Sequence, residues 1–475
     1  MLKHFVLGAG LLAFCVPSMA QKNAPAEGSA QALQAGVVVP KVVSSTNPEQ
    51  SYALYLPSKY ASNERWPVVY AFDPAARGSL PVELMKEVAE RYGYIVAGSN
   101  NSKNGDWRPQ VEAVQAILQD TRSRLSIDER RVYFAGFSGG ARLAASVAQR
   151  CKCAAGVLLS GAGFAPNSPP VADAGFAVFE TVGTFDFNYG EVVTLDGKLD
   201  ALRYEHALRR FDGPHQWAPE AVMNEALAWF KLMAMKSGFE ERDTAFIKAQ
   251  AAESEKRAKT LESDGNPYGA WSEYRQAAKT FDNLGEASAF RERAVALEKE
   301  KAVRDGAKRE QQEFEEQARL TEEISQGLAS LRQDSSNRAD IHNTVEQQIV
   351  DLRNRTEHEK RAEKLRVLRR ALAGVFIEAM ETGNRLLDTK DYSHARTYFE
   401  LGADADPDSL WALSNVAVAL ALEGDRKGAL ESLRRAKAKS KDPATFSAWL
   451  KDEPAFAKLR DTPDFRALFP TALQP

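Results

Sequence analysis

Residues 131–145 read RVYFAGFSGGARLAA. Their first part is β-branched and aromatic, which predicts a buried strand, and their last part has the small and apolar residues of a closely packed helix. Gly136 to Gly140 join the two in the pattern G-x-S-x-G at a strand-to-helix turn. Glycines two before and two after the serine let strand and helix approach, so the hydroxyl projects above the sheet. The sequence therefore predicts Ser138 as a nucleophile, with the Gly139 N–H facing a developing oxyanion.

Around this turn, from residue 48 to about residue 237, β-rich runs alternate with amphipathic stretches. Such alternation indicates a mostly parallel sheet with helices on both faces, an α/β fold. The predicted strands are Tyr52 to Leu56, Pro67 to Phe72, Tyr94 to Gly98, Arg131 to Ala135, Gly156 to Ser160, Phe176 to Val182 and Tyr204 to Phe211. The predicted helices are Pro81 to Tyr92, Trp107 to Leu125, Ala141 to Gln149 and Pro219 to Met235.

Beyond residue 240 the sequence becomes helical and charged. No proline lies between Pro267 and Pro407, and residues 286–365 contain 33 Asp, Glu, Lys or Arg among 80 positions. This composition predicts long solvated helices, with a break near residues 334–337. The sequence thus indicates an all-α region after the α/β domain.

A repeat follows, in which small and large apolar residues recur 34 positions apart. The first unit contains Gly383, Ala395, Phe399 and Gly402, and the second contains Ala417, Ala429, Leu433 and Ala436. Small residues recur where two helices approach closely, and a large one fills the gap between them. The spacing resembles the tetratricopeptide repeat, a helix-turn-helix unit that often holds peptides or other proteins. The stretch from Ala444 to Leu468 is expected to act as a terminal cap.

The N-terminus has the pattern of a secretory signal. Lys3 and His4 precede an apolar run, and small residues at Ser18 and Ala20 predict cleavage after Ala20. That run is too short for a membrane span, so an exported, periplasmic or secreted protein is expected. The expected domains are residues 1–20 as the signal, 21–47 as a flexible entry segment, 48–240 as the α/β domain, 241–374 as the charged helices, and 375–475 as the repeats and cap.

Composition excludes several classes of protein. With 475 residues, 44% hydrophobic and 27% charged, the chain is globular and long enough for several domains. A formal net charge of −3 produces no electric field that would attract nucleic acid or an anionic membrane to the molecule as a whole. Cys151 and Cys153 are spaced C-x-C, and because a disulfide across one residue closes a small, strained ring, two separate half-buried cysteines are the preferred interpretation. No phosphate-binding loop or His-Glu-x-x-His motif occurs, so neither cofactor nor metal is expected.

A serine nucleophile needs a base, and up to residue 240 the mature sequence offers His206 and His215. His206 falls inside a predicted strand, whereas His215 lies in a loop after that strand, where doubly wound folds place their working groups. We therefore prefer His215. The base in turn needs a carboxylate, and Asp186 lies in the loop after the strand Phe176 to Val182. Its competitors are Asp196, Asp200 and Asp212.

The order Ser138, Asp186, His215 is the chain order of α/β-hydrolases. Residues 48–237 resemble that fold, and are most similar to secreted esterases of the polyhydroxybutyrate-depolymerase and feruloyl-esterase type. The resemblance rests on Tyr55 to Pro57, the strand Val68 to Phe72, Gly-Phe-Ser-Gly-Gly, the Gly-x-x-Asp loop and the Gly-x-His-x-Trp loop, and covers under half of the chain.

One segment departs from the resemblance. Such esterases often carry His-Gly after the third strand, whereas this chain has Asp73-Pro74-Ala75. Proline has no N–H, so a second oxyanion donor has to come from Asp73 or Ala75, and Ala75 is the candidate chosen here. Aromatic residues near the site loops suggest a substrate pocket; the chosen candidates are Phe137, Trp107, Phe187 and Trp217.

Together these features predict an exported serine esterase acting on a small-molecule or polymer ester. The helical repeats could hold a protein partner. The alternative is a binding protein in which the hydrolase fold is inert and the repeats do the work.

Overall fold

The structure is a computed structural model, and it describes residues 33–333 and 336–469. The predicted signal at 1–20 and the first part of the entry segment lie outside the described residues. The chain forms two compact units. Of the described residues, the first comprises 33–184 and 189–306, and the second comprises 185–188, 307–333 and 336–469. The predicted combination of an α/β domain and an all-α region is confirmed.

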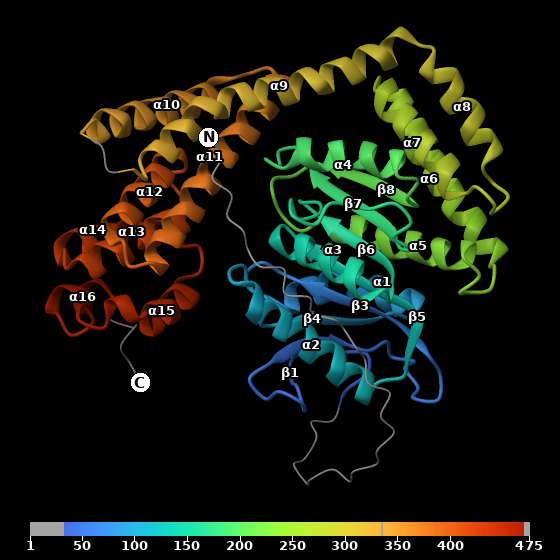
Figure 1. Cartoon of the computed structure of the whole chain (residues 1–475), viewed down its shortest axis with the longest axis horizontal. Helices are drawn as coiled ribbons and strands as arrows, with labels where there is room; N and C mark the ends of the chain where they lie inside the picture. The colour runs from blue at the N-terminus through green and yellow to red at the C-terminus, as the bar shows by residue number, and fades with distance from the viewer. Residues whose placement is uncertain (1–32, 334–335, 470–475) are drawn as a thin grey trace. The chain divides into compact units, whose positions relative to one another are not determined.

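An eight-stranded sheet forms the centre of the first unit, in the order β1-β2-β4-β3-β5-β6-β7-β8 (Figure 1). The pairs β1/β2 and β2/β4 are antiparallel, and all the other neighbours are parallel. The strands are β1 Val38–Val43, β2 Ser51–Tyr55, β3 Trp66–Phe72, β4 Ile95–Ser99, β5 Ile127–Phe137, β6 Ala154–Ser160, β7 Ala177–Gly183 and β8 His206–Phe211.

Helices cover both faces of this sheet because alternate residues of each strand are apolar on both sides. On one face Tyr133 and Phe179 pack with α1 and α5, and on the other Phe134 and Val178 pack with α2, α3 and α4. The helices are α1 Ser79–Tyr92, α2 Trp107–Arg124, α3 Gly139–Cys151, α4 Tyr189–Ala201, α5 Glu220–Lys236, α6 Thr244–Ser263, α7 Pro267–Thr280 and α8 Ser288–Glu298.

Two features of the first unit differ from the sequence expectation. Residues 38–43 form strand β1, although they were assigned to a flexible entry segment; Pro40 is tolerated there because β1 is an edge strand. The helices α6 to α8 were assigned to the charged region 241–374, but they belong to the sheet-containing unit, which extends to Gly306.

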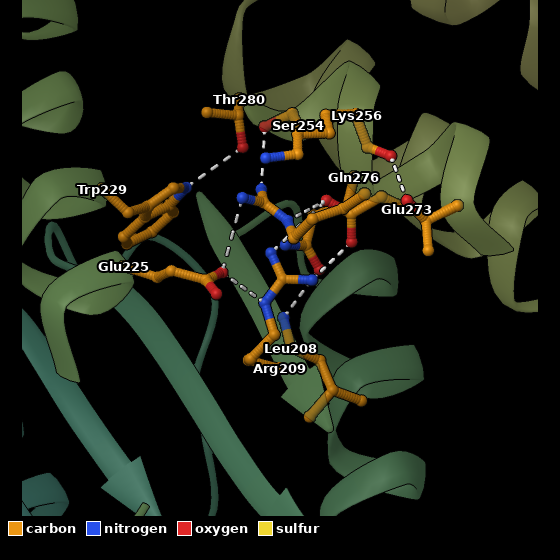
Figure 2. A network of polar contacts seen from close by, with 11 residues as sticks. Leu208, Arg209, Glu225, Trp229, Ser254, Lys256, Glu273, Gln276 and Thr280 are labelled. Carbon is orange, nitrogen blue, oxygen red and sulfur yellow. Dashed lines mark hydrogen bonds and ion pairs between the residues drawn. The ribbon is translucent and has the colours of Figure 1, made fainter. Parts of the chain in front are cut away.

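A polar network explains why α6 and α7 belong with the sheet (Figure 2). On β8, the half-buried Arg209 forms ion pairs with Glu225 of α5, at 2.7 Å, and with Glu273 of α7. Arg257 of α6 donates to the same Glu273 from 3.0 Å. The backbone N–H of Leu208 on β8 donates to Gln276 of α7. Because β8 ends the sheet, this contact caps part of its open edge.

The cysteine pair also differs from expectation. Cys151 and Cys153 form a disulfide with their Cα atoms 5.1 Å apart. Lys152 between them has a φ of 51°, which turns the chain sharply at the end of α3. This left-handed turn brings the two Cβ atoms to the same side, an arrangement that their spacing alone did not indicate.

Glu180 is a buried polar residue in the middle of β7. Its side chain is completely buried, and neither of its oxygens has a hydrogen-bond partner within the described part of the chain. Burial raises the pKa of Glu180 well above its usual value; the nearby Asp196 carboxylate adds to the shift, and Arg210 opposes it. The folded protein therefore favours the protonated, neutral form of this side chain.

This raised pKa makes stability depend on pH. The folded state keeps a proton that the unfolded chain loses above about pH 4.3, so the free energy of unfolding falls as the pH rises from that value towards the folded-state pKa. We expect Glu180→Gln, which is neutral and similar in shape, to raise the thermal midpoint more at pH 8 than at pH 5. Glu112→Gln, at an exposed position on α2, is the matched control. An equal shift at both pH values would contradict the assignment.

The second unit consists of helices. After α9, Lys301–Ser330, they are α10 Arg338–His358, α11 Ala362–Asp388, α12 Tyr392–Ala405, α13 Leu410–Glu423, α14 Arg426–Lys439, α15 Pro443–Asp452, the 3₁₀ turn Pro454–Phe456 and α16 Pro463–Leu468. The interval between α9 and α10 agrees with the predicted break, although residues 334 and 335 themselves lie outside the description. No helix within the described ranges is long and apolar enough to cross a membrane.

The repeated positions lie at the helix contacts of this unit. Ala395, Phe399, Ala429 and Leu433 are all completely buried. A Cβ added to Gly383 on α11 would lie 2.5 Å from the Phe399 ring of α12, so a glycine is required for this close approach. The side chains of Asp391 and Asp425, 34 positions apart, cap the N-termini of α12 and α14.

Candidate functional site

Ser138 lies at the sharp turn between β5 and α3. Its φ of 53° and ψ of −121° place it in a region that L-residues rarely adopt. A Cβ on Gly136 would lie 2.0 Å from the Gly140 oxygen, and one on Gly140 would lie 2.0 Å from the Phe72 oxygen. Both glycines are therefore required by close backbone packing, as the motif predicts. The Ser138 N–H donates to the Ser160 carbonyl, at 2.8 Å, which fixes the turn to the end of β6.

Gly139 is the first residue of α3, so its N–H has no acceptor within the helix. The positive end of the helix dipole lies at the same place. This N–H lies directly beside the nucleophile in the chain and is free of helical pairing. The Gly139 N–H can therefore donate a hydrogen bond to a negatively charged oxygen, as an oxyanion donor must.

The loop that carries His215 follows β8 and lies against the nucleophile turn. The His215 ring centroid is 4.6 Å from that of Phe137, the residue before Ser138, and the Trp217 ring is 5.9 Å from the same Phe137. The Ala218 N–H donates to the Ser160 Oγ, at 3.2 Å. Ser160 therefore holds both the nucleophile turn and the histidine loop.

His206 lies at the opposite end of the parallel strands from Ser138. It begins β8, whereas Ser138 follows the end of the parallel strand β5. Its Nδ1 lies 2.9 Å from the Tyr204 carbonyl oxygen, and its Nε2 lies 3.3 Å from an Asp196 carboxylate oxygen. These contacts identify His206 as a packed structural residue.

The aspartates near β8 are engaged in different ways. Asp196 pairs with His206, Asp200 pairs with Arg275 and Lys279, and Asp212 accepts from the Thr184 hydroxyl at 3.1 Å. Asp186 is completely buried, and its carboxylate accepts the Asn188 N–H at 2.8 Å. This short turn fixes the direction of the Asp186 carboxylate.

The loop that contains Asp186 begins at the end of β7, next to the end of β8 in the sheet. Two residues before it, the Thr184 N–H donates to the Phe211 carbonyl, at 2.8 Å, at the end of β8. A Cβ on Gly183 would lie 2.3 Å from the Gly213 oxygen. The acid loop and the His215 loop therefore leave the sheet from adjacent strand ends. The pairing of Asp186 with His215 stays a prediction.

The predicted pocket residues fall into two groups. Phe137 and Trp217 lie together with His215, as described above. Trp107, which is 42% exposed, has its ring contact with Arg150 in the last turn of α3. Phe187 belongs to the second unit, where its carbonyl accepts from Gln317.

Asp73 has a structural role that sequence reasoning did not find. Its buried carboxylate accepts hydrogen bonds from Trp217 Nε1 at 2.8 Å and from Arg77 at 2.9 Å. Burial raises the pKa of Asp73, but the hydrogen bonds from Arg77, Trp217 and the Ala75 N–H outweigh it and lower the pKa overall. An ionised Asp73 therefore anchors the histidine loop through Trp217. The sequence offered one signal of this role: Asp73 carries a carboxylate directly after the predicted strand Pro67 to Phe72.

The Ala75 N–H donates to this same carboxylate, at 2.9 Å. The choice of Ala75 as the second oxyanion donor therefore does not fit the structure, because its hydrogen is already directed at Asp73. Of the two alternatives that the sequence left open, only the Asp73 N–H remains on this segment.

No protein-family model matches the chain, and no curated protein sequence matches it either. Among solved structures, a ferulic acid esterase is similar with a TM-score of 0.37 and 16% identity, over 42% of this chain and 98% of that one. The S-formylglutathione hydrolase FrmB from Staphylococcus aureus has a TM-score of 0.34 and 12% identity, over 41% and 95%. Esterase B from Lactobacillus rhamnosis has a TM-score of 0.33 and 17% identity, over 41% and 85%.

Proposed function

We propose that this protein is an exported serine hydrolase that cleaves carboxylic esters through Ser138, His215 and Asp186. The observation that carries the proposal is the strained backbone of Ser138 at the start of α3, with the His215 ring packed against the preceding residue. A strained nucleophile is retained where its exposure serves chemistry. Substrates of the proposed enzyme are small-molecule or polymer esters.

In the proposed reaction, Ser138 Oγ attacks the ester carbonyl carbon while His215 accepts the hydroxyl proton. The tetrahedral intermediate places its negative oxygen at the Gly139 N–H, and His215 returns the proton to the departing alcohol. Water then attacks the acyl-enzyme by the same route and releases the acid. Asp186 holds the His215 imidazole in the required tautomer. Each step needs only groups of this chain and water.

The helical unit serves, in this proposal, as a protein-interaction module built on tetratricopeptide-like repeats. The support is the 34-residue recurrence of buried small residues and of the capping Asp391 and Asp425. A partner held there would localise the esterase or deliver its substrate.

A fluorophosphonate probe tests the catalytic proposal directly. We expect covalent labelling of the native protein at Ser138, together with hydrolysis of short p-nitrophenyl esters, and loss of both in Ser138→Ala. Unfolded protein is the control, because labelling must depend on the folded site. Clean absence of labelling in the native protein would favour the inert hydrolase fold with working repeats.

A further inference from the structure

On the segment after β3, the Asp73 N–H is the one backbone donor left for the candidate oxyanion site. Pro74 has no N–H, and the Ala75 and Ala76 N–H groups donate to the carboxylate and the carbonyl of Asp73. If the Gly139 N–H at the start of α3 is the only donor, the negative oxygen receives a single directed hydrogen bond. A further donor would have to come from the Asp73 N–H or from another part of the chain.

The loop between β4 and α2 brings a carboxamide to this place. The Asn104 backbone N–H donates to the Pro74 carbonyl, at 2.8 Å, which fixes the loop beside the segment after β3. A Cβ built on Gly139 would lie 2.0 Å from Asn104 Oδ1 and 2.7 Å from Asn104 Nδ2. The Asn104 carboxamide therefore lies directly against the Cα of the residue that follows the nucleophile.

This contact also explains a glycine that the motif does not require. In G-x-S-x-G the obligatory glycines are Gly136 and Gly140, and position 139 accepts other residues. Here any side chain at position 139 would displace Asn104. The glycine thus makes room for the carboxamide.

The carboxamide also has unused hydrogen-bonding capacity. Across residues 33–333 and 336–469, the structure shows no hydrogen bond to the Asn104 side chain, and this residue is exposed. An amide carries two N–H donors at Nδ2, and half a turn of the terminal torsion exchanges Nδ2 with Oδ1. A donor at this location can point at an oxygen bound over Gly139 without breaking another contact.

We propose that the Asn104 carboxamide supplies the second hydrogen bond to the oxyanion, in place of a backbone donor from the segment after β3. This inference rests on the proposed serine hydrolase function of Ser138. Asn104 would then be a catalytic residue, since it touches the reacting oxygen. The hydrogen bond strengthens as negative charge develops, so its effect falls on the transition state rather than on substrate binding.

The test compares Asn104→Ala with wild type in p-nitrophenyl ester hydrolysis. We expect kcat to fall about 10²- to 10³-fold with an unchanged KM. Asn104→Asp keeps the shape but removes the donor and adds a negative charge, so its kcat should fall at least as far. Fluorophosphonate labelling of Ser138 should slow in both variants, because the phosphonyl oxygen uses the same donors.

Asn101→Ala is the matched control, because Asn101 lies in the same loop and supports it by accepting the Ser51 N–H. A purely structural role for Asn104 predicts equal losses in Asn101→Ala and Asn104→Ala, and that result would overturn the proposal. An unchanged kcat in Asn104→Ala, with wild type active and labelled, would overturn it too and assign the second donor to the Asp73 N–H. If wild type is neither active nor labelled, the proposed function itself fails, and this inference fails with it.

Discussion

Replacement of His215 by alanine is expected to lower kcat for ester hydrolysis about 10⁶-fold, because a serine hydroxyl without a general base is a poor nucleophile. His215 is the histidine whose ring packs on the nucleophile strand. The loss should appear in kcat rather than KM, because the imidazole moves a proton and contributes little to ground-state binding. Steady-state kinetics with a short p-nitrophenyl ester measures both parameters.

His206→Asn is the matched control for this prediction. It removes the other candidate histidine while keeping a donor for the Tyr204 carbonyl, and residue 206 lies at the opposite end of β8 from the His215 loop. We expect the folded variant to keep wild-type kcat. A large loss of kcat in His206→Asn, with His215→Ala still active, would reverse the assignment of the base.

Glu273→Gln is expected to destabilise the protein by about 3 kcal/mol. This change keeps the volume of the side chain but removes the negative charge that Arg209 and Arg257 share (Figure 2). The Arg209 side chain is 13% exposed, and a largely buried cation that loses a partner carries an uncompensated desolvation cost. Urea unfolding, followed by tryptophan fluorescence, measures the change.

The stabilisation by Glu273 should also depend on pH, which unfolding measurements at decreasing pH can test. Burial raises the pKa of Glu273, but Arg209 and Arg257 outweigh it and lower the pKa overall. The stabilisation is therefore present above the unfolded carboxyl pKa of about 4.3 and is lost as the pH falls through the folded-state value.

The control for Glu273→Gln is Glu255→Gln. The partner of Glu255, Lys259, is exposed, so the effect of this variant on the free energy of unfolding should stay within about 1 kcal/mol. Equal effects from the two variants would contradict the role of burial.

Much of the fold could be predicted because its signals are local. The run from Arg131 to Ala135 is apolar on both faces, and a strand of this kind is recognisable without its neighbours. Strand β1 was missed because residues 21–48 are small and polar with few large apolar side chains, which is typical of a flexible segment. The assignment of α6 and α7 was missed because Arg209 and Glu273, 64 positions apart, explain each other only in space.

The candidate site was predictable to the extent that each residue follows a strand end. Ser138, His215 and Asp186 are each in a loop of that kind. Ala75 failed for a different reason, since whether an N–H is available depends on which carboxylate folds back onto it. Asn104 has no motif of its own, because its relation to Gly139 exists only after two loops have met.

The cover that α7 gives to β8 has a practical consequence for expression. A fragment cut at residue 240 would leave the Leu208 N–H and the charge of Arg209 without their α7 partners. Exposed strands with free donors recruit other chains, so such a fragment should precipitate or form oligomers. A recombinant fragment that keeps the sheet edge covered should instead run through Gly306.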